Sequence, residues 1–336
     1  MNILAIQKER QSAVEYYRTA PWLGMARTYN CRVDFIPARE VRETALMEYD
    51  IIFSHRPVTP AEIRALVLAK SHGVKIVLDY DDLIWNIPVS NPAILHFTED
   101  AAFATAEAMR LADMVICSTP ALQAAIQRDW GKDAEVIPNA WDERQRISRA
   151  WNAPKVDKPT VIAWRGSDTH AGDLYQARDA FFESSEVKWI FFGMLPWFIL
   201  KQYGGNLDSF TFQGPTAGFS EYLRTFEKMR PSYVVFPLED VEFNRCKSNI
   251  AWQEATAIGA TVIAPAYMPE FERVPCIRYR DINELAQWLI TCSANGYNND
   301  TSNELWNESV IKLKEDYALT TQIARRYMLL DGLLSR

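Results

Sequence analysis

The sequence has few features of secreted, membrane-spanning or metal-binding proteins. It contains five cysteines in 336 residues. Their number is odd, they are scattered along the chain, and no two of them form a C-x-x-C motif. This disfavours a disulfide framework and a cysteine-based zinc site. No apolar run is long enough to span a bilayer, and a strand-like segment begins at residue 2 without the pattern of a signal peptide. We therefore expect a cytoplasmic protein with reduced thiols and no transmembrane segment.

The sequence also lacks an excess of positive charge. It has 36 Lys and Arg against 43 Asp and Glu, for a formal net charge of -7. This balance disfavours a broad nucleic-acid-binding face, although a local basic groove is compatible with it. Hydrophobic residues make up 48% and charged residues 24% of the chain, as in soluble globular proteins. The length suits two domains better than one core.

What the chain does have is a repeated alternation of short apolar runs and helical patterns. The apolar runs are residues 3–6, 34–36, 51–53, 75–78, 114–117 and 135–137, and then 160–164, 188–192, 209–212, 233–236, 261–264 and 277–279. Helical patterns lie between them, for example at residues 60–70, 101–111 and 120–129. Continuous apolar strands separated by helices predict an α/β fold with parallel sheets covered on both faces.

The alternation is interrupted once, by a polar stretch that carries arginines and prolines. We place a linker there, at residues 146–158, between a first domain (1–145) and a second domain (159–315). Two consecutive doubly wound domains place a ligand crevice at the carboxyl ends of both sheets. The chain ends in a long helical pattern, from about residue 305 to 330, which forms either one helix or a broken one.

The most informative segment contains a candidate anion site at the start of a helix. Lys247, Ser248 and Asn249 fall at this start, followed by Ile250. Free backbone N–H groups and the positive end of the helix dipole collect at such a start, and Lys247 adds a point charge for a phosphate. Glu254 lies further along, where a carboxylate can accept hydrogen bonds from sugar hydroxyls. Phosphate donors followed by an acceptor of sugar hydroxyls suit a nucleotide. The alternative interpretation of this segment is an ordinary helix between two strands.

A second candidate site opens the second domain. Gly166 follows a predicted strand and allows close backbone approach to a ligand. Arg165 can hold a diphosphate through bidentate hydrogen bonds. Ser167 either contacts the ligand or caps the next helix. His170 either orients a phosphate or sugar or has a structural role.

A third group of polar residues follows two strands of the first domain. Asp79, Asp81 and Asp82 concentrate three carboxylates at a strand end, where they could bind a divalent metal, orient sugar hydroxyls or form an Asx turn with a helix cap. Arg56, after His55, either faces the crevice or belongs to a buried structural pair.

Four stretches, in this order and spacing, resemble the GT-B glycosyltransferases, especially the large retaining family numbered four and its surface-polysaccharide or phage branch. They are residues 112–122 (ADMVICSTPAL), 136–142 (VIPNAWD), 162–173 (IAWRGSDTHAGD) and 237–264 (PLEDVEFNRCKSNIAWQEATAIGATVIA). The resemblance implies two Rossmann-like domains that face an interdomain crevice. It also implies that residues 316–336 cross back to the first domain.

The resemblance implies a retaining glycosyltransferase that moves a hexosyl or pentosyl group from a nucleotide diphosphate sugar to an acceptor hydroxyl, without a metal or other cofactor. Arg165, Lys247 and the helix start would stabilise the leaving diphosphate. Glu254 would hold the ribose. Asp81 and Asp82 would lie near the sugar or the acceptor, which leaves Asp79 in a structural role.

The sequence departs from the family pattern at two places. Family members often carry two glutamates separated by seven residues, and Glu254 fits the second, but Cys246 stands at the first. A thiol cannot replace a carboxylate as acceptor of sugar hydroxyls. Either Glu239, Asp240 or Asn244 takes this role, or the protein binds an unusual donor or has lost catalysis. The loop after the first strand also lacks the glycine pair of many GT-B enzymes, which argues against phosphate contact there.

Three other functions fit the same residues. The acceptor could be a hydroxymethylated DNA base, with Arg144, Arg146 and Arg149 lining a groove. The protein could also be a noncatalytic nucleotide-sugar-binding module, given Cys246, or a sugar-nucleotide epimerase. The sequence leaves the nucleotide base, the sugar, the acceptor and the oligomeric state open.

Overall fold

Two parallel six-stranded sheets form the frame of the protein. The computed structural model describes residues 1–6, 15–148, 160–183, 187–203, 210–216, 218–294 and 299–335. The first sheet has the strand order β2-β1-β3-β4-β5-β6 and the second the order β12-β11-β10-β7-β8-β9. The predicted α/β class is therefore confirmed, and each predicted apolar run lies in a strand or overlaps one.

The strands of the first sheet are β1 (Asn2–Ile6), β2 (Arg32–Ile36), β3 (Ile51–His55), β4 (Lys75–Tyr80), β5 (Met114–Cys117) and β6 (Ala134–Val136). Those of the second are β7 (Val161–Gly166), β8 (Lys188–Gly193), β9 (Phe210–Gln213), β10 (Tyr233–Val235), β11 (Thr261–Pro265) and β12 (Ile277–Tyr279). Successive residues of a central strand enter different cores: Leu4 and Ile6 pack on one face of the first sheet, Ile3 and Ala5 on the other. Since both faces are covered, these strands read as continuous apolar runs.

The helices of the first half are α1 (Ala20–Gly24), α2 (Glu43–Leu46), α3 (Pro60–Ser71), α4 (Glu99–Leu111) and α5 (Pro120–Trp130), with short helical turns at Glu15–Thr19, Ala26–Tyr29, Ala38–Glu40 and Pro92–His96. Threonines mark the starts of the three longest. Thr59, Thr98 and Thr119 each accept a hydrogen bond from a backbone N–H of the first turn. Such caps satisfy donors that have no partner inside the helix.

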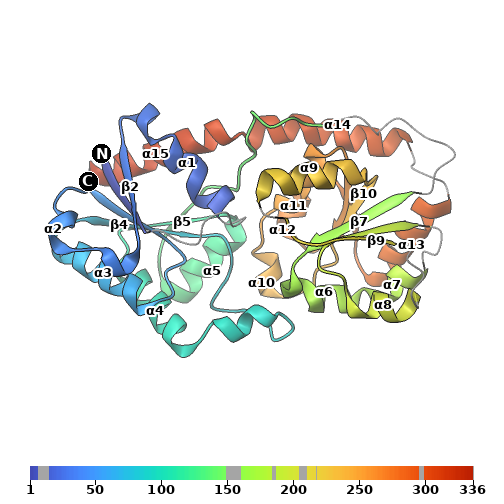
Figure 1. Ribbon diagram of the computed structural model, residues 1–336, viewed down its shortest axis with the longest axis horizontal. Helices are drawn as coiled ribbons and strands as arrows, with labels where there is room; N and C mark the ends of the chain where they lie inside the picture. Colours follow the sequence, from blue (N-terminus) through green and yellow to red (C-terminus); the bar gives the residue numbers. More distant parts are fainter. Residues whose placement is uncertain are drawn as a thin grey trace.

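The helices of the second half are α6 (Ala171–Gln176), α7 (Arg178–Glu183), α8 (Trp197–Tyr203), α9 (Phe219–Met229), α10 (Glu242–Arg245), α11 (Ile250–Ala257), α12 (Pro269–Glu272) and α13 (Ile282–Ala294), with a turn at Asp168–His170. Phe226 of α9 and Trp252 of α11 pack on one face of the second sheet. Leu174 of α6 and Leu285 of α13 pack on the other. The two faces are thus covered by different sets of helices (Figure 1).

The last two helices, α14 (Asn299–Asp316) and α15 (Leu319–Leu334), run along one side of both halves (Figure 1). α14 packs on the second half through Leu313, whereas Ile323 and Leu330 of α15 pack on the first sheet. The long predicted helix is therefore broken where it passes between the halves. There Trp141 forms a parallel β-bridge with Ala318, so the two crossings of the chain lie side by side. None of the helices described is both long and apolar enough to cross a membrane.

Candidate functional site

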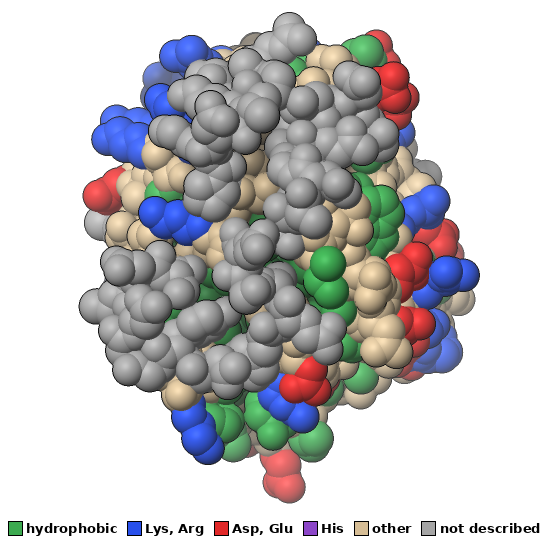
Figure 2. Space-filling view, turned by 90° about the vertical axis from the view of Figure 1, so that its right-hand side faces the viewer, with side chains coloured by type: hydrophobic (Ala, Val, Ile, Leu, Met, Phe, Trp, Pro, Cys, Tyr) green, Lys and Arg blue, Asp and Glu red, His purple; other side chains and the backbone are tan. Residues whose placement is uncertain are grey.

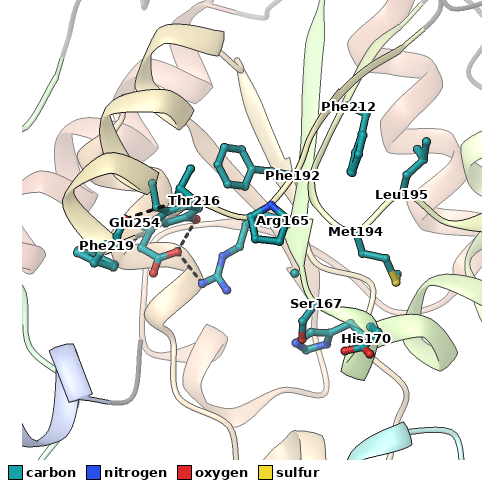
Figure 3. Close-up of a pocket in the computed structure, with 16 residues that line it drawn as sticks. Arg165, Ser167, His170, Phe192, Met194, Leu195, Phe212, Thr216, Phe219 and Glu254 are labelled. Carbon is teal, nitrogen blue, oxygen red and sulfur yellow. Dashed lines mark hydrogen bonds and ion pairs between the residues drawn. The ribbon is translucent and has the colours of Figure 1, made fainter. Parts of the chain in front are cut away.

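Two adjoining cavities lie at the carboxyl ends of the strands. The larger, about 750 Å³, belongs to the second half and is bounded by the ends of β7, β8 and β9 and the start of α9 (Figure 3). The smaller, about 200 Å³, lies between the halves. Arg165, His170 and Glu254 line both cavities. The three residues therefore mark the place where one elongated ligand could pass from one cavity to the other.

The larger cavity has mostly apolar walls. Phe192, Met194, Leu195, Phe212 and Phe219 surround it (Figure 3). Its volume lies within the range of about 300–1,000 Å³ that is usual for small-molecule sites. Aromatic walls can pack on the faces of a flat ring, so the cavity suits a heterocyclic base more than a charged group.

Glu254 of α11 accepts hydrogen bonds from both halves of the molecule. Tyr17 donates to its Oε1 at 2.9 Å, and Tyr222 of α9 donates to its Oε2 at 2.8 Å. Arg165 forms an ion pair with the same Oε2 at 2.7 Å. Burial, followed by the charge of Glu254, raises the pKa of both tyrosines well above the ordinary value, so both remain donors. A carboxylate with two hydroxyl donors on it matches what a ribose diol could offer.

Arg165, at the end of β7, still has one buried donor to offer. No described group accepts a hydrogen bond from its Nε, although this atom is buried. Burial is the largest single effect and lowers the pKa of the guanidinium, but the charge and hydrogen bond of Glu254, together with Tyr222 and Tyr17, raise it overall, so Arg165 stays charged. A buried cation with an unpaired N–H is a favourable partner for an anionic oxygen.

Acidic and basic side chains of both halves meet in the smaller cavity. Asp81 accepts hydrogen bonds from His55, at 2.9 Å, and from Arg56. Asp82 accepts one from Arg56 at 2.6 Å and lies 3.9 Å from Lys247 Nζ. Although burial is the largest single effect and raises the pKa of Asp81, Arg56, His55 and Arg18 together hold it well below its usual range. This side of the site therefore carries fixed charges of both signs.

Asp79 has a structural place, as expected. It is fully buried in β4 and forms ion pairs with Arg18, at 2.9 Å, and with Arg326 of α15, at 2.5 Å. Arg18 also donates to the backbone of Ile137 and to Asn139. Since Asp79 faces this cluster, the three acids do not converge. Among the described residues, no group of three or more His, Cys, Asp or Glu side chains is arranged to hold a metal ion.

The structure brings together most of the residues selected from the sequence. The two cavities are lined by Asp81, Asp82, Arg165, Gly166, Ser167, His170, Lys247, Ser248, Ile250 and Glu254. The side chains of Asn244 and Asn249 are engaged elsewhere. Asn249, the residue before α11, donates to Tyr317 and Glu270, and Asn244 donates to Asp173. Any ligand contact of Asn249 would therefore come from its backbone.

Cys246 belongs to the contact between the halves. It is 2% exposed and packs with Phe243 on the core of the first half, and its carbonyl accepts a hydrogen bond from Thr119. Burial raises the pKa of its thiol to about 12, so it is no nucleophile. Of the residues expected to compensate for it, Asp240 is paired with Arg245. Glu239 accepts a hydrogen bond from Ser90.

Several residues of the site were not selected from the sequence. Tyr222 is a spaced aromatic on a helix, a pattern that ordinarily indicates core packing. Phe212 ends a predicted strand, and Met194 lies two residues after another. The rule that ligands bind at the carboxyl ends of strands could therefore have found both. Tyr17 lies in the turn Glu15–Thr19, and only the tertiary structure brings it to Glu254. The loop expected to avoid phosphate, residues 7–14, lies outside the described residues.

The proposed DNA groove is only partly described. Arg149 lies outside the described residues. Arg144 forms an ion pair with Asp142 at 2.7 Å, and Arg146 lines a separate cavity of about 150 Å³. On the face shown in Figure 2, basic and acidic side chains alternate along the right-hand edge, whereas basic side chains gather at the upper left. The described contacts of Arg144 and Arg146 do not form a continuous basic groove.

Comparisons with known proteins find similarity at the level of structure. No protein-family model and no curated protein sequence matches the chain. The Anabaena protein HepE in complex with UDP superposes with a TM-score of 0.71 and 14% identity, covering 98% of this chain and 99% of HepE. An α,α-trehalose 6-phosphate synthase from Burkholderia multivorans gives 0.60 and 13%, covering 89% and 73%. A putative UDP-N-acetylglucosamine 2-epimerase from Listeria monocytogenes gives 0.52 and 12%, covering 94% and 97%.

Identities this low establish a likeness of fold alone. The relevant features are the two parallel sheets, the helices on both of their faces and the crevice between the halves. They correspond across nearly the whole length of this chain and of HepE. The protein therefore has the GT-B fold.

Proposed function

We propose that the protein is a glycosyltransferase that transfers a sugar from a nucleotide diphosphate sugar to an acceptor hydroxyl, with retained anomeric configuration and without a metal ion. The observation that carries this proposal is the junction of an apolar cavity with a charged one at Arg165, His170 and Glu254. A nucleotide sugar has the same order of parts: a flat base, a ribose, a diphosphate and a sugar.

The proposed placement follows from the chemistry of the walls. The base lies in the apolar cavity, among Phe192, Phe212 and Phe219. The ribose hydroxyls donate to Glu254, in place of a tyrosine hydroxyl that donates to it now. The diphosphate lies in the smaller cavity between Arg165 and Lys247. Uracil is the base that we favour, because HepE of the same fold has been solved with UDP.

The proposed chemistry is electrostatic. When the sugar leaves, negative charge grows on the terminal phosphate oxygen, and two preorganised cations stabilise this charge more than that of the bound donor. Arg165 contributes its buried Nε–H, from which no described residue accepts a hydrogen bond. Lys247, whose side chain is 20% exposed and lies over the ring of Phe243, contributes a point charge. Together they supply the role that a divalent cation has in other transferases.

The acceptor side of the proposed site is the first half. Asp81 is fixed by His55 and Arg56, whereas Asp82 lies nearer to Lys247. An acceptor hydroxyl that approaches from this side can donate a hydrogen bond to one of these carboxylates. Because the donor is held by the second half, the two substrates meet between the halves, where water is displaced.

Mass spectrometry of the protein incubated with UDP-sugars and candidate acceptors tests this proposal. Transfer gives UDP and a product heavier by one glycosyl group. Release of free sugar without transfer would indicate hydrolysis, and a donor of unchanged mass but altered sugar configuration would indicate the epimerase alternative. Donor binding without any turnover would favour the noncatalytic alternative. The anomeric configuration of an isolated product, read by NMR, distinguishes retention from inversion.

A further inference from the structure

His170 occupies a fixed position where the two cavities meet. Its Nδ1 lies 2.7 Å from Oδ2 of Asp173. Asp173 is held in turn, because its Oδ1 accepts hydrogen bonds from the backbone N–H of Glu239, at 2.8 Å, and from Asn244 Nδ2, at 2.9 Å. Asp173 is 6% exposed, so this arrangement is shielded from water. The carboxylate therefore positions the imidazole before any ligand arrives.

The hydrogen bond to Asp173 determines what the rest of the ring can do. Because Nδ1 faces a carboxylate, Nδ1 carries a hydrogen and Nε2 is the ring nitrogen left for a ligand. Within the described part of the chain, no hydrogen bond engages His170 Nε2. A neutral ring can only accept at Nε2, whereas a protonated ring donates there. A phosphate oxygen needs a donor, so the ring must be protonated to bind it.

We propose that His170, positioned by Asp173, takes up a proton when a nucleotide diphosphate binds and then donates a hydrogen bond from Nε2 to a phosphate oxygen. This inference rests on the proposed function and adds one residue pair to it. Asp173 is a positioning residue, and His170 is a phosphate ligand whose charge depends on the ligand.

The charges around His170 give the direction of this coupling. Burial lowers its pKa in the empty site; the hydrogen bond to Asp173 opposes this, while the positive charges of Lys247 and Arg165 lower the pKa further. Asp82, on the opposite wall of the smaller cavity, lies 3.9 Å from Lys247 and offsets part of its charge. A diphosphate brings two negative charges to the two cations, so the imidazolium becomes favourable once the ligand is bound.

Proton uptake has a measurable consequence. Where the pH lies between the pKa of the empty site and that of the complex, affinity falls as pH rises, by at most about tenfold per pH unit for one proton. UDP-glucose is a suitable probe, because both of its phosphates are diesters and do not titrate near neutral pH. Calorimetry between pH 6 and 8.5, in two buffers of different ionisation enthalpy, gives both the affinity and the number of protons taken up.

Two variants separate His170 from the other histidines. His170→Gln keeps a side-chain donor but cannot titrate, so we expect weaker binding at pH 6, little change at pH 8.5 and no proton uptake. His72→Gln is the matched control, since His72 is exposed at the end of α3 and pairs with Glu43. It should behave like the unmodified protein. Loss of uptake in His55→Gln, with uptake retained in His170→Gln, would overturn the assignment.

A measurement without any variant guards against a folding defect. The chain has four histidines, so their ring carbons can be followed by NMR in the labelled protein. We expect one resonance to titrate at a higher pH with UDP-glucose than without it. Binding without this shift and without proton uptake would contradict the role of His170 but not the nucleotide site. If UDP-glucose and UDP did not bind at any pH, and GDP, ADP and their sugar derivatives did not bind either, the proposed function itself would be contradicted.

Discussion

Tyr17 of the first half donates a 2.9 Å hydrogen bond to Glu254 of the second half, 237 positions later in the chain. Next to it, Tyr16 stacks on Phe219 with ring centroids 3.8 Å apart. The two neighbouring tyrosines thus join the halves directly over the cavity in which we place the nucleoside. Tyr17 occupies an oxygen of Glu254 that a ribose hydroxyl would use. Donor binding and this contact between the halves therefore compete for one atom.

The competition predicts a gain of affinity in Tyr17→Phe. The phenyl ring keeps the packing, but Oε1 of Glu254 loses a donor, so the ribose no longer has to displace it. A net hydrogen bond contributes about 1 kcal/mol, which corresponds to roughly fivefold tighter UDP binding by calorimetry. Tyr29→Phe is the control, because Tyr29 stacks on Tyr327, away from the cavity. A loss of affinity in Tyr17→Phe would instead mean that the hydroxyl contacts the nucleotide.

Glu254→Gln should keep the fold and weaken nucleotide binding, because an amide oxygen accepts hydrogen bonds less strongly than a carboxylate. The comparison of UDP with 2′-deoxy-UDP makes the test specific for the ribose. We expect the unmodified protein to prefer UDP and the variant to lose most of this preference. Equal preference in both proteins, or a donor-bound structure with Glu254 turned away from the ribose, would remove Glu254 from this role.

Lys247→Ala should weaken binding of the diphosphate. The loss of one charge-assisted contact costs about 1.5–3 kcal/mol, which is roughly a 10- to 150-fold loss of affinity for UDP. Pyrophosphate should show a similar loss, whereas uridine, which lacks phosphates, should bind the variant unchanged. Lys314→Ala on the exposed side of α14 provides the control. Unchanged UDP affinity in folded Lys247→Ala would exclude this lysine from the site.

Turnover should survive a metal chelator. The two cations that we assign to the leaving diphosphate, Arg165 and Lys247, are part of the chain and are not removed by EDTA. We expect equal initial rates before and after treatment with EDTA, and no stimulation by added manganese or magnesium. Loss of activity with EDTA, restored by manganese or magnesium, would overturn this prediction. It would make Asp81 and Asp82 candidate metal ligands.

Glu270 should make stability depend on pH. Burial raises its pKa from the ordinary 4.5 to about 7. Below pH 4.5, Glu270 is protonated in both the folded and the unfolded chain. Between pH 4.5 and about 7, Glu270 loses its proton only in the unfolded chain. The folded state thus loses on the order of 3 kcal/mol as pH rises to 7. Glu270→Gln should therefore raise the free energy of unfolding at pH 8 but not at pH 4.

Denaturant titrations of Glu270→Gln at the two pH values measure this difference. Gln keeps an acceptor for Asn249, which donates to Glu270 at 3.3 Å. Glu272→Gln is the matched control, since Glu272 lies on the same short helix, α12, and is exposed. The same gain at both pH values would mean that charge is not the cause.

The sheets could be predicted from the sequence because parallel strands buried on both faces leave a direct signal. Side chains on both faces of such a strand enter a core, so the strand reads as an uninterrupted apolar run, as in residues 51–53 of β3. A break in the long final helix was allowed for, but its position at Tyr317 and Ala318 has no comparable signal. It arises because Trp141 bonds to both sides of the break, a contact between segments far apart in the chain.

The charged part of the site could be predicted for a similar reason. Arg165 directly follows a predicted strand and Lys247 lies at a predicted helix start, and the carboxyl ends of parallel strands converge. The aromatic part could not, because Phe192 and Tyr222 have the spacing of ordinary core residues. The partners of Glu254 were not predicted either. Its carboxylate was expected to bind a ribose. In the structure it already accepts hydrogen bonds from Tyr17 and Tyr222 and forms an ion pair with Arg165.

The ion pair between Asp79 and Arg326 has a consequence for the order in which the protein can be made. The two residues are 247 positions apart, so at about 5–20 residues per second a ribosome needs roughly 12–50 seconds to add the second after the first. Until α15 emerges, one face of the first sheet, including Ile3 and Phe53, lacks the part of its cover that Ile323 and Leu330 supply. The first half therefore reaches its final packing after the second half has been synthesised, and a nascent chain must protect an unfinished sheet in the meantime.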